Sequence, residues 1–180
     1  MPKKYNLALT PISKSDEAVN CANGFSKLAD KYLLGDGSLP HVTLYQFNAE
    51  EKEIDGIWNR VSAAWEEGPI ELEFKKFSCI TFDNSIFWVS LLPDNCDKLH
   101  EMHALIAHVI NLPIIKSFDP HMTLISTKDK DYEKEVDKQL SSYRPISDKF
   151  VLTLGESDDV GQVTKMIYCC EVKSRAVCRM

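Results

Sequence analysis

The sequence predicts an α+β protein built as two pseudo-symmetric lobes around a central cleft, each lobe an antiparallel sheet backed by helices. The main observation is that the pattern P-H-x-T-L occurs twice, at Pro40–Leu44 and at Pro120–Leu124, with the histidines eighty positions apart in 180 residues. The order of predicted elements also repeats: strand, helix, motif strand, helix, long strand. We therefore expect one bilobal domain over residues 1–180, with lobes at about 1–83 and 84–180 that can exchange strands.

Hydrophobic periodicity assigns the elements of the first half. Alternation with a period of two indicates strands, and apolar residues at helical spacing indicate helices. Asn48 is expected to cap the second helix, and the Lys75–Lys76 step shifts the alternation of the long strand, which indicates a bulge. The predicted elements are a strand at 5–10, a helix from Ser13 to about Leu34, the first motif strand, a helix to about Trp65, and a strand at 70–82 followed by a turn at Asp83-Asn84.

The second half repeats this order. Leu9 falls on Val89 under the same shift of eighty residues that superimposes His41 on His121. The predicted elements are a strand at 86–92, a helix from Pro93 to about Val109, a loop from Asn111 to Pro120, the second motif strand, a helix from Asp129 or Asp131 to about Leu140, a strand at 146–155, and a last strand after Gly161 with Met166, Tyr168, Cys170 and Val172 facing inward.

Both motifs are predicted to be strands with an apolar back and a polar front. Because successive side chains of a strand point to opposite faces, each histidine shares a face with the threonine two residues later. A pseudo-twofold axis between the lobes would place both polar faces on one cleft. The predicted catalytic residues are His41, Thr43, His121 and Thr123.

Composition limits the classes of ligand. The formal net charge is −6, whereas a protein that binds long nucleic acid needs a basic surface to neutralise phosphates. We therefore expect a small nucleotide or the end of an RNA as substrate, and no long duplex. There is no apolar leader, no apolar run long enough to cross a membrane, and no C-x-x-C spacing among the six cysteines, so we expect a cytoplasmic monomer with reduced thiols and no membrane partner.

Two histidines on one cleft suit proton transfer at phosphorus. Imidazole titrates near neutrality, so one ring can remove a proton from water or a ribose hydroxyl while the other protonates the leaving oxygen. The threonine hydroxyls can donate to the non-bridging phosphate oxygens. This scheme needs no cofactor and no metal, and only one carboxylate, Asp119, stands beside a motif histidine.

The paired motifs resemble those of the two-histidine (2H) phosphoesterases, which include LigT-type RNA 2′,3′-cyclic phosphodiesterases, plant cyclic phosphodiesterases and 2′,5′-phosphodiesterase relatives. The family pattern is H-x-[ST]-x with apolar residues at x, and both copies in this chain match it at every position. The similarity of layout covers most of the chain, although only the two motifs are specific. The resemblance implies metal-independent cleavage of cyclic or 2′-linked phosphodiesters, with one histidine as base and the other as acid.

Residues that contact the substrate are less clearly marked. The strand face that carries Asn6, Ala8 and Thr10 maps onto Ile86, Trp88 and Ser90 under the eighty-residue shift, so Trp88 could stack on a base. The predicted substrate-binding residues are Tyr45, which continues the His41 face, Trp88, Ser90 and Lys116. His100 and His103, on one predicted helix, are expected at the surface.

The sequence thus predicts a phosphodiesterase that hydrolyses a 2′,3′-cyclic phosphate on a nucleotide or RNA end, or ADP-ribose 1″,2″-cyclic phosphate. One alternative is a 2′,5′-oligonucleotide phosphodiesterase or an RNA 3′-end exonuclease, which a basic track leading from the cleft would favour. Two others are a non-catalytic nucleotide-binding module and a structural α+β domain whose motif histidines lie far apart.

Overall fold

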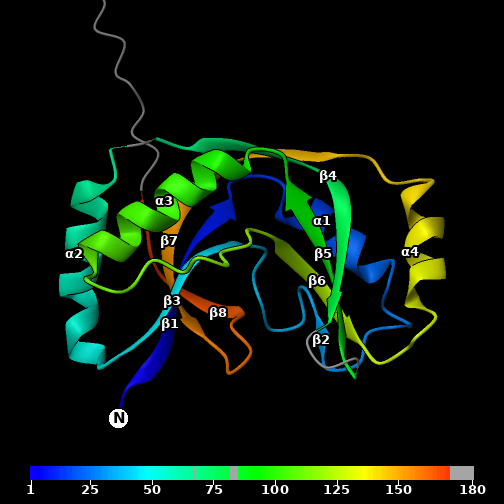
Figure 1. Ribbon diagram of the computed structural model, residues 1–180, viewed down its shortest axis with the longest axis horizontal. Coiled ribbons are helices and arrows are strands. Elements are labelled where there is room, and N and C mark those ends of the chain that lie inside the picture. Colours follow the sequence, from blue (N-terminus) through cyan, green and yellow to red (C-terminus); the bar gives the residue numbers. More distant parts are fainter. Residues whose placement is uncertain (67, 82–84, 171–180) are drawn as a thin grey trace, which may run out of the picture.

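The computed structural model describes residues 1–66, 68–81 and 85–170, so the turn predicted at Asp83-Asn84 and the inward position predicted for Val172 lie outside the described residues. It confirms the α+β architecture, with one antiparallel sheet in the order β2-β6-β5-β4-β7-β1-β3 and β8 paired to β7 (Figure 1). None of the helices in these ranges is long and apolar enough to span a bilayer. The elements are β1 (Lys3–Pro11), α1 (Ser15–Asn23), β2 (Tyr32–Leu33), β3 (Val42–Ala49), the short 3₁₀ helix η1 (Glu51–Glu53), α2 (Ile54–Ala64), β4 (Ile70–Thr81), β5 (Phe87–Pro93), α3 (Cys96–Val109), β6 (Met122–Thr127), α4 (Tyr132–Leu140), β7 (Ile146–Ser157) and β8 (Val163–Cys169).

The sheet has two halves, and each takes strands from both the first and the second half of the sequence. Strands β3, β1, β7 and β8 form one half, and β2, β6, β5 and β4 form the other. Helix α3 packs against β3, whereas α1 packs against β6. Figure 1 shows the halves side by side, with α2 and α3 over the first and α1 and α4 over the second. The two motif strands, β3 and β6, therefore lie in different halves.

A bulge in β4 joins the halves. As far as Phe74, β4 pairs with β7, and from Lys76 onward it continues along β5 with a shifted register. Lys75 is the extra residue, and its ammonium forms ion pairs with Glu73 (2.6 Å) and Asp94 (2.8 Å). The predicted bulge is thus confirmed, and it lies where the strand changes partner.

Three predicted details are wrong. The first helix ends at Asn23, because Tyr32 must be extended to pair with β6 and the Leu34 N–H donates to the Leu124 carbonyl at 2.8 Å. Asn48 lies within β3, and a capping box of Glu50 and Glu53 begins the following 3₁₀ turn instead. Met166 is 41% exposed, because among the described strands β8 pairs with β7 alone and has one uncovered edge.

The apolar backs of both motif strands lie in the core, as predicted. The side chains that follow the histidines and threonines, Val42, Leu44, Met122 and Leu124, are at most 1% exposed. Burial of such side chains is the main favourable contribution to folding. It also fixes the two polar fronts on the opposite side of the strands.

Candidate active site

Each motif histidine lies immediately before its strand, and both are held in the same way. His41 Nδ1 lies 2.7 Å from the Leu39 carbonyl oxygen, and His121 Nδ1 lies 2.7 Å from the Asp119 carbonyl oxygen. A carbonyl oxygen can only accept, so Nδ1 of each ring carries the hydrogen and donates it. In the neutral ring, Nε2 is then the nitrogen that can accept a proton. The two motifs therefore share not only their sequence but also the tautomer of their histidine.

The structure brings the two motifs to one cavity of about 260 Å³. Five of the residues predicted from the sequence lie in its wall: His41, Thr43, Trp88, His121 and Thr123. The other described residues of the wall are Gln46, Ile80, Phe118, Asp119, Val160, Gly161 and Gln162. The reading of the motifs as accidental, which required the histidines to lie far apart, does not fit this arrangement.

A bulge at the same position of both motif strands determines which side chains face this cavity. Thr43 pairs with Ala8 and Tyr45 with Leu7, so Leu44 is an extra residue between them. In the second half, Leu124 occupies the equivalent position in β6. One extra residue resets the alternation of a strand. The Tyr45 side chain is therefore turned to the opposite face of the strand. Gln46 occupies the place in the cavity wall that was predicted for Tyr45.

The same pairing corrects the register of the internal repeat. Val89 pairs with Ile125 as Leu7 pairs with Tyr45, so Val89 is equivalent to Leu7 and not to Leu9. The face predicted to be open is unchanged, but Trp88 is now equivalent to Asn6, and Ser90 to Ala8. Both Asn6 and Trp88 thus stand beside a motif strand on its polar side.

Three of the predicted substrate-binding residues do not line the cavity. Tyr45 is 5% exposed, and its hydroxyl donates to the Pro113 carbonyl at 2.7 Å. Ser90 pairs with Thr123 but is 1% exposed and is not among the residues that line the cavity. Lys116 is exposed on the loop before the second motif. Of the four predicted residues, Trp88 alone reaches the cavity wall.

Asn6, which was not among the predicted site residues, orients one of the motif threonines. Its amide nitrogen donates to Thr43 Oγ1 at 2.9 Å and to the Gly161 carbonyl at 3.0 Å, and Gln46 Nε2 donates to the same carbonyl at 3.1 Å. Because Thr43 Oγ1 accepts from Asn6, its own hydrogen remains available for a phosphate oxygen. Gly161 has φ of 98°, and a Cβ at this position would overlap the Gln46 amide, so the close approach requires glycine.

Burial keeps His41 neutral at pH 7. Desolvation of the charged form, reinforced by the nearby His121 ring, lowers the pKa of His41 from 6.5 to about 4, against smaller opposing effects of the Leu39 carbonyl, Asp158 and the Gly161 carbonyl. The His121 side chain is 33% exposed, and a carboxylate oxygen of Asp119 lies 3.8 Å from its Nδ1. The two histidines therefore occupy different environments despite their matching backbone contacts.

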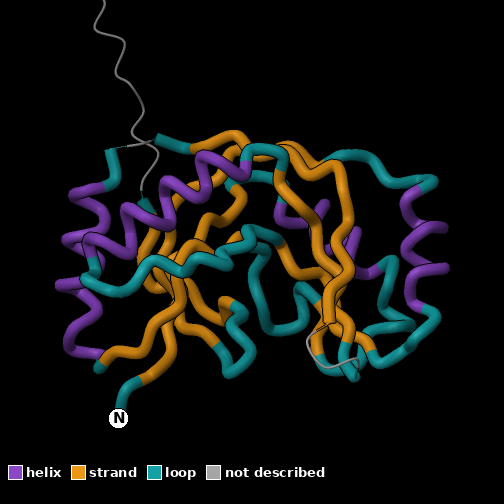
Figure 2. Tube along the Cα trace, in the orientation of Figure 1, coloured by secondary structure: helices purple, strands orange, loops and turns teal. Residues whose placement is uncertain are grey.

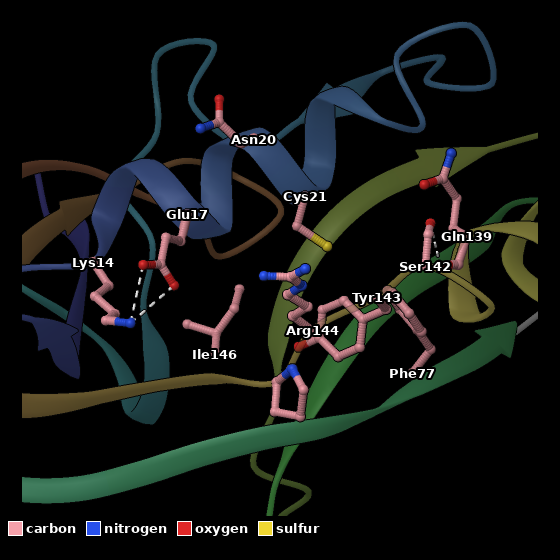
Figure 3. Close-up of a pocket in the computed structure, with 11 residues that line it drawn as sticks. Lys14, Glu17, Asn20, Cys21, Phe77, Gln139, Ser142, Tyr143, Arg144 and Ile146 are labelled. Carbon is pink, nitrogen blue, oxygen red and sulfur yellow. Dashed lines mark hydrogen bonds and ion pairs between the residues drawn. The ribbon is translucent and has the colours of Figure 1, made fainter.

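A second cavity, of about 510 Å³, lies between α1 and the segment 139–146 (Figure 3). Lys14 forms an ion pair with Glu17 at 3.0 Å on one side, and Phe77, Tyr143 and Arg144 lie on the other. Its described lining contains no histidine. It is larger than the motif cavity, but its one described carboxylate, Glu17, is paired with Lys14, and it holds neither motif, so the motif cavity is the candidate active site.

Most of the wall residues that the sequence did not reveal come from loops. Phe118 and Asp119 belong to the segment before the second motif, and Val160, Gly161 and Gln162 belong to the turn between β7 and β8. Asp119 stands directly before the proline of the second motif, and this position in the sequence could have been used to predict it as a residue of the site. In the described ranges, no group of three or more His, Cys, Asp or Glu side chains is placed to hold a metal ion.

Comparisons with known proteins agree with the predicted resemblance. The family model of the 2′-5′ RNA ligase superfamily matches residues 26–172. A search of curated proteins finds no match. The fold is similar to that of E. coli LigT in complex with phosphate (TM-score 0.60, 11% identity, 94% of this chain and 96% of that chain) and with NADP⁺ (TM-score 0.59, 12% identity, 94% and 98%).

Kluyveromyces marxianus Usb1 with uridine monophosphate is also similar (TM-score 0.50, 13% identity, 92% and 96%). At these identities the structures show likeness of fold, whereas the family match rests on the sequence itself. Because that match covers most of the chain, including both motifs, the protein belongs to the 2′-5′ RNA ligase superfamily, the two-histidine phosphoesterases with a LigT-like fold.

Proposed function

We propose that this two-histidine phosphoesterase hydrolyses a cyclic phosphodiester: a 2′,3′-cyclic phosphate on a nucleotide or RNA end, or ADP-ribose 1″,2″-cyclic phosphate. The observation that carries the proposal is the matched pair of histidines on one cavity, each with Nδ1 held by a carbonyl. Such a pair can accept and donate protons on the two sides of a phosphorus atom.

The two environments suggest a division of roles. His41, which is buried and neutral, is suited to accept a proton from the attacking water. An imidazolium at position 121 would form an ion pair with Asp119 and is suited to protonate the departing ribose oxygen. The hydroxyls of Thr43 and Thr123 donate to the non-bridging oxygens, where negative charge develops in the transition state.

The cavity favours small or terminal substrates over long RNA. Its volume of about 260 Å³ lies just below the usual range of ligand pockets, which is roughly 300–1,000 Å³. Among the described wall residues there is no lysine or arginine, so the cavity itself offers no cationic side chain for the phosphates of a longer RNA. Trp88 offers an indole ring for stacking on a base, which is compatible with a nucleotide or with ADP-ribose.

The proposal is tested by turnover of 2′,3′-cyclic mononucleotides, ADP-ribose 1″,2″-cyclic phosphate and 2′,5′-linked oligonucleotides in EDTA. Wild type is compared with His41→Ala and His121→Ala, and with His108→Ala as the control, because His108 is exposed on α3 and does not line the cavity. We expect a fall of roughly a hundredfold or more in each motif variant, the usual scale for losing a general acid or base, and no change in the control.

The alternatives give different results in the same assay. Cleavage of the 2′,5′-linked oligomers alone would identify a 2′,5′-oligonucleotide phosphodiesterase and leave the two-histidine mechanism unchanged. Turnover that is unaffected by both motif substitutions would refute the proposed site. Binding of nucleotides without turnover of any substrate would favour a non-catalytic binding module.

A further inference from the structure

A third histidine, which takes no part in the proposed proton transfers, is built into the support of the active site. His100 and His103 on α3 were both expected at the surface. His100 is exposed, as predicted, but His103 is 1% exposed, and the prediction for it is wrong. Its ring contacts Leu44 of the first motif strand and Ile115 of the segment 111–120. That segment runs from the end of α3 across the molecule to β6 (Figure 2). His103 therefore stands between the two halves of the candidate site.

Both ring nitrogens of His103 have backbone partners. Nδ1 lies 2.7 Å from the carbonyl oxygen of Leu44, the residue after Thr43, and Nε2 lies 3.0 Å from the backbone nitrogen of Ile115. The carbonyl must accept and the backbone N–H must donate, so the ring is neutral with its hydrogen on Nδ1. Losing either partner would leave a buried polar group unpaired, which is why such a contact fixes the ring firmly.

The faces of the His103 ring are covered by two aromatic rings. Phe118 stacks on it at 4.3 Å with an interplanar angle of 7°, and Tyr45 stacks at 5.3 Å and 10°. The Tyr45 hydroxyl holds the Pro113 carbonyl. The segment 111–120 is thus attached to the first half at Pro113, at Ile115 and at Phe118, and two of these three contacts involve His103.

The attached segment ends in active-site residues. Phe118 and Asp119 line the motif cavity, and the Asp119 carbonyl holds Nδ1 of His121. We propose that His103 is a positioning residue that fixes the Phe118 ring in the cavity wall and, through Asp119, the tautomer and orientation of His121. His103 lies on α3, which packs on β3, the strand of the first motif. It therefore also sets the distance between His41 and His121.

The structural part of this proposal can be tested without turnover. In protein labelled with ¹⁵N-histidine, long-range ¹H–¹⁵N spectra report which ring nitrogen carries hydrogen. In wild type, at a pH where the rings are uncharged, we expect the Nδ1–H form for His41, His103 and His121. His103→Phe keeps a flat ring between its aromatic neighbours but removes both hydrogen bonds. We expect this variant to shift the His121 signals toward a mixture of tautomers and to leave those of His41 in place.

The matched control is His108→Phe, the same change at an exposed position of the same helix, which we expect to leave every other histidine signal unchanged. Tyr45→Phe removes only the contact with Pro113, and we expect it to shift His121 in the same direction by a smaller amount. This second variant keeps the test open if His103→Phe fails to fold. A His121 spectrum identical to that of wild type in each folded variant at positions 103 and 45 would overturn the proposal.

The kinetic part rests on the proposed function. With a 2′,3′-cyclic mononucleotide, we expect His103→Phe to lower kcat roughly tenfold, within the hundredfold that a misplacement of about 1 Å can cost, and to raise KM because Phe118 moves. His108→Phe should match wild type. If wild type turns over no substrate, the proposed function fails, whereas the histidine spectra still decide whether His103 positions His121. If His103→Phe shifts the spectra but leaves kcat and KM unchanged, the positioning of His121 is confirmed and the kinetic part of the proposal is refuted.

Discussion

Acid should destabilise this protein through His41 in a range of pH that the structure defines. The pKa of His41 falls from 6.5 in the unfolded chain to about 4 in the folded one. Between these values the unfolded state binds a proton that the folded state does not, so the free energy of unfolding rises with pH across this range. At about 1.4 kcal/mol per pKa unit, the contribution lost on going from pH 7 to pH 4 is about 3 kcal/mol.

The measurement is urea unfolding of wild type and His41→Gln at several pH values from 4 to 7. Taking the difference between the two proteins removes the titration of the many carboxylates, which both share. We expect the advantage of wild type to shrink by about 3 kcal/mol from pH 7 to pH 4. Thr43→Val is the control, because it changes the same strand without removing a titrating group and should lower stability equally at every pH. Stability curves of wild type and His41→Gln that run parallel would refute the reasoning.

Three further substitutions test the wall of the cavity. Gly161→Ala should lower kcat/KM roughly tenfold, because a left-handed backbone costs other residues about 1–2 kcal/mol and the new Cβ displaces Gln46; unchanged kinetics would contradict the close packing. Asn6→Leu should lower the free energy of unfolding in urea by about 1–3 kcal/mol, since it leaves the Thr43 hydroxyl without its donor; a change below about 0.5 kcal/mol would show that these bonds contribute little. Trp88→Leu should raise KM for 2′,3′-cyclic AMP by roughly tenfold, the scale of one stacked base, but not for ribose 2,3-cyclic phosphate, which lacks a base; equal effects on both substrates would argue against stacking.

The fold could be predicted from the sequence to the extent that local patterns specify it. The alternating residues of β1 and the phase shift at Lys75 depend on neighbours in sequence, and both were predicted correctly. The end of the first helix could not be predicted in this way. Residues such as Phe25 continue the helical spacing, but pairing of Tyr32 with β6, about ninety positions later, decides the conformation of that segment.

The candidate site shows the same division. The four motif residues were evident because two copies of one pattern draw attention to each other, and the structure places all four on one cavity. The assignment of Tyr45 failed at a single bulge, at Leu44, that no local signal marks. Gln46 and Gly161 remained hidden because each matters through a contact with a distant part of the chain, and the burial of His103 depends on Leu44, Ile115 and Phe118 together.

Each half of the sheet combines strands that are far apart in the sequence, and this has a consequence for how the chain folds. Leu7 pairs with Leu154, so the first strand finds one of its neighbours only when nearly the whole chain is present. Closing such long loops costs conformational entropy before the contacts compensate for it, which slows folding. A fragment that ends near residue 83 would contain the first motif but lack β7 and the helix that packs on β3. We therefore expect the duplicated motifs to depend on each other for folding, because each wall of the cavity rests on strands from both halves of the chain, and we expect neither half alone to fold into a working wall.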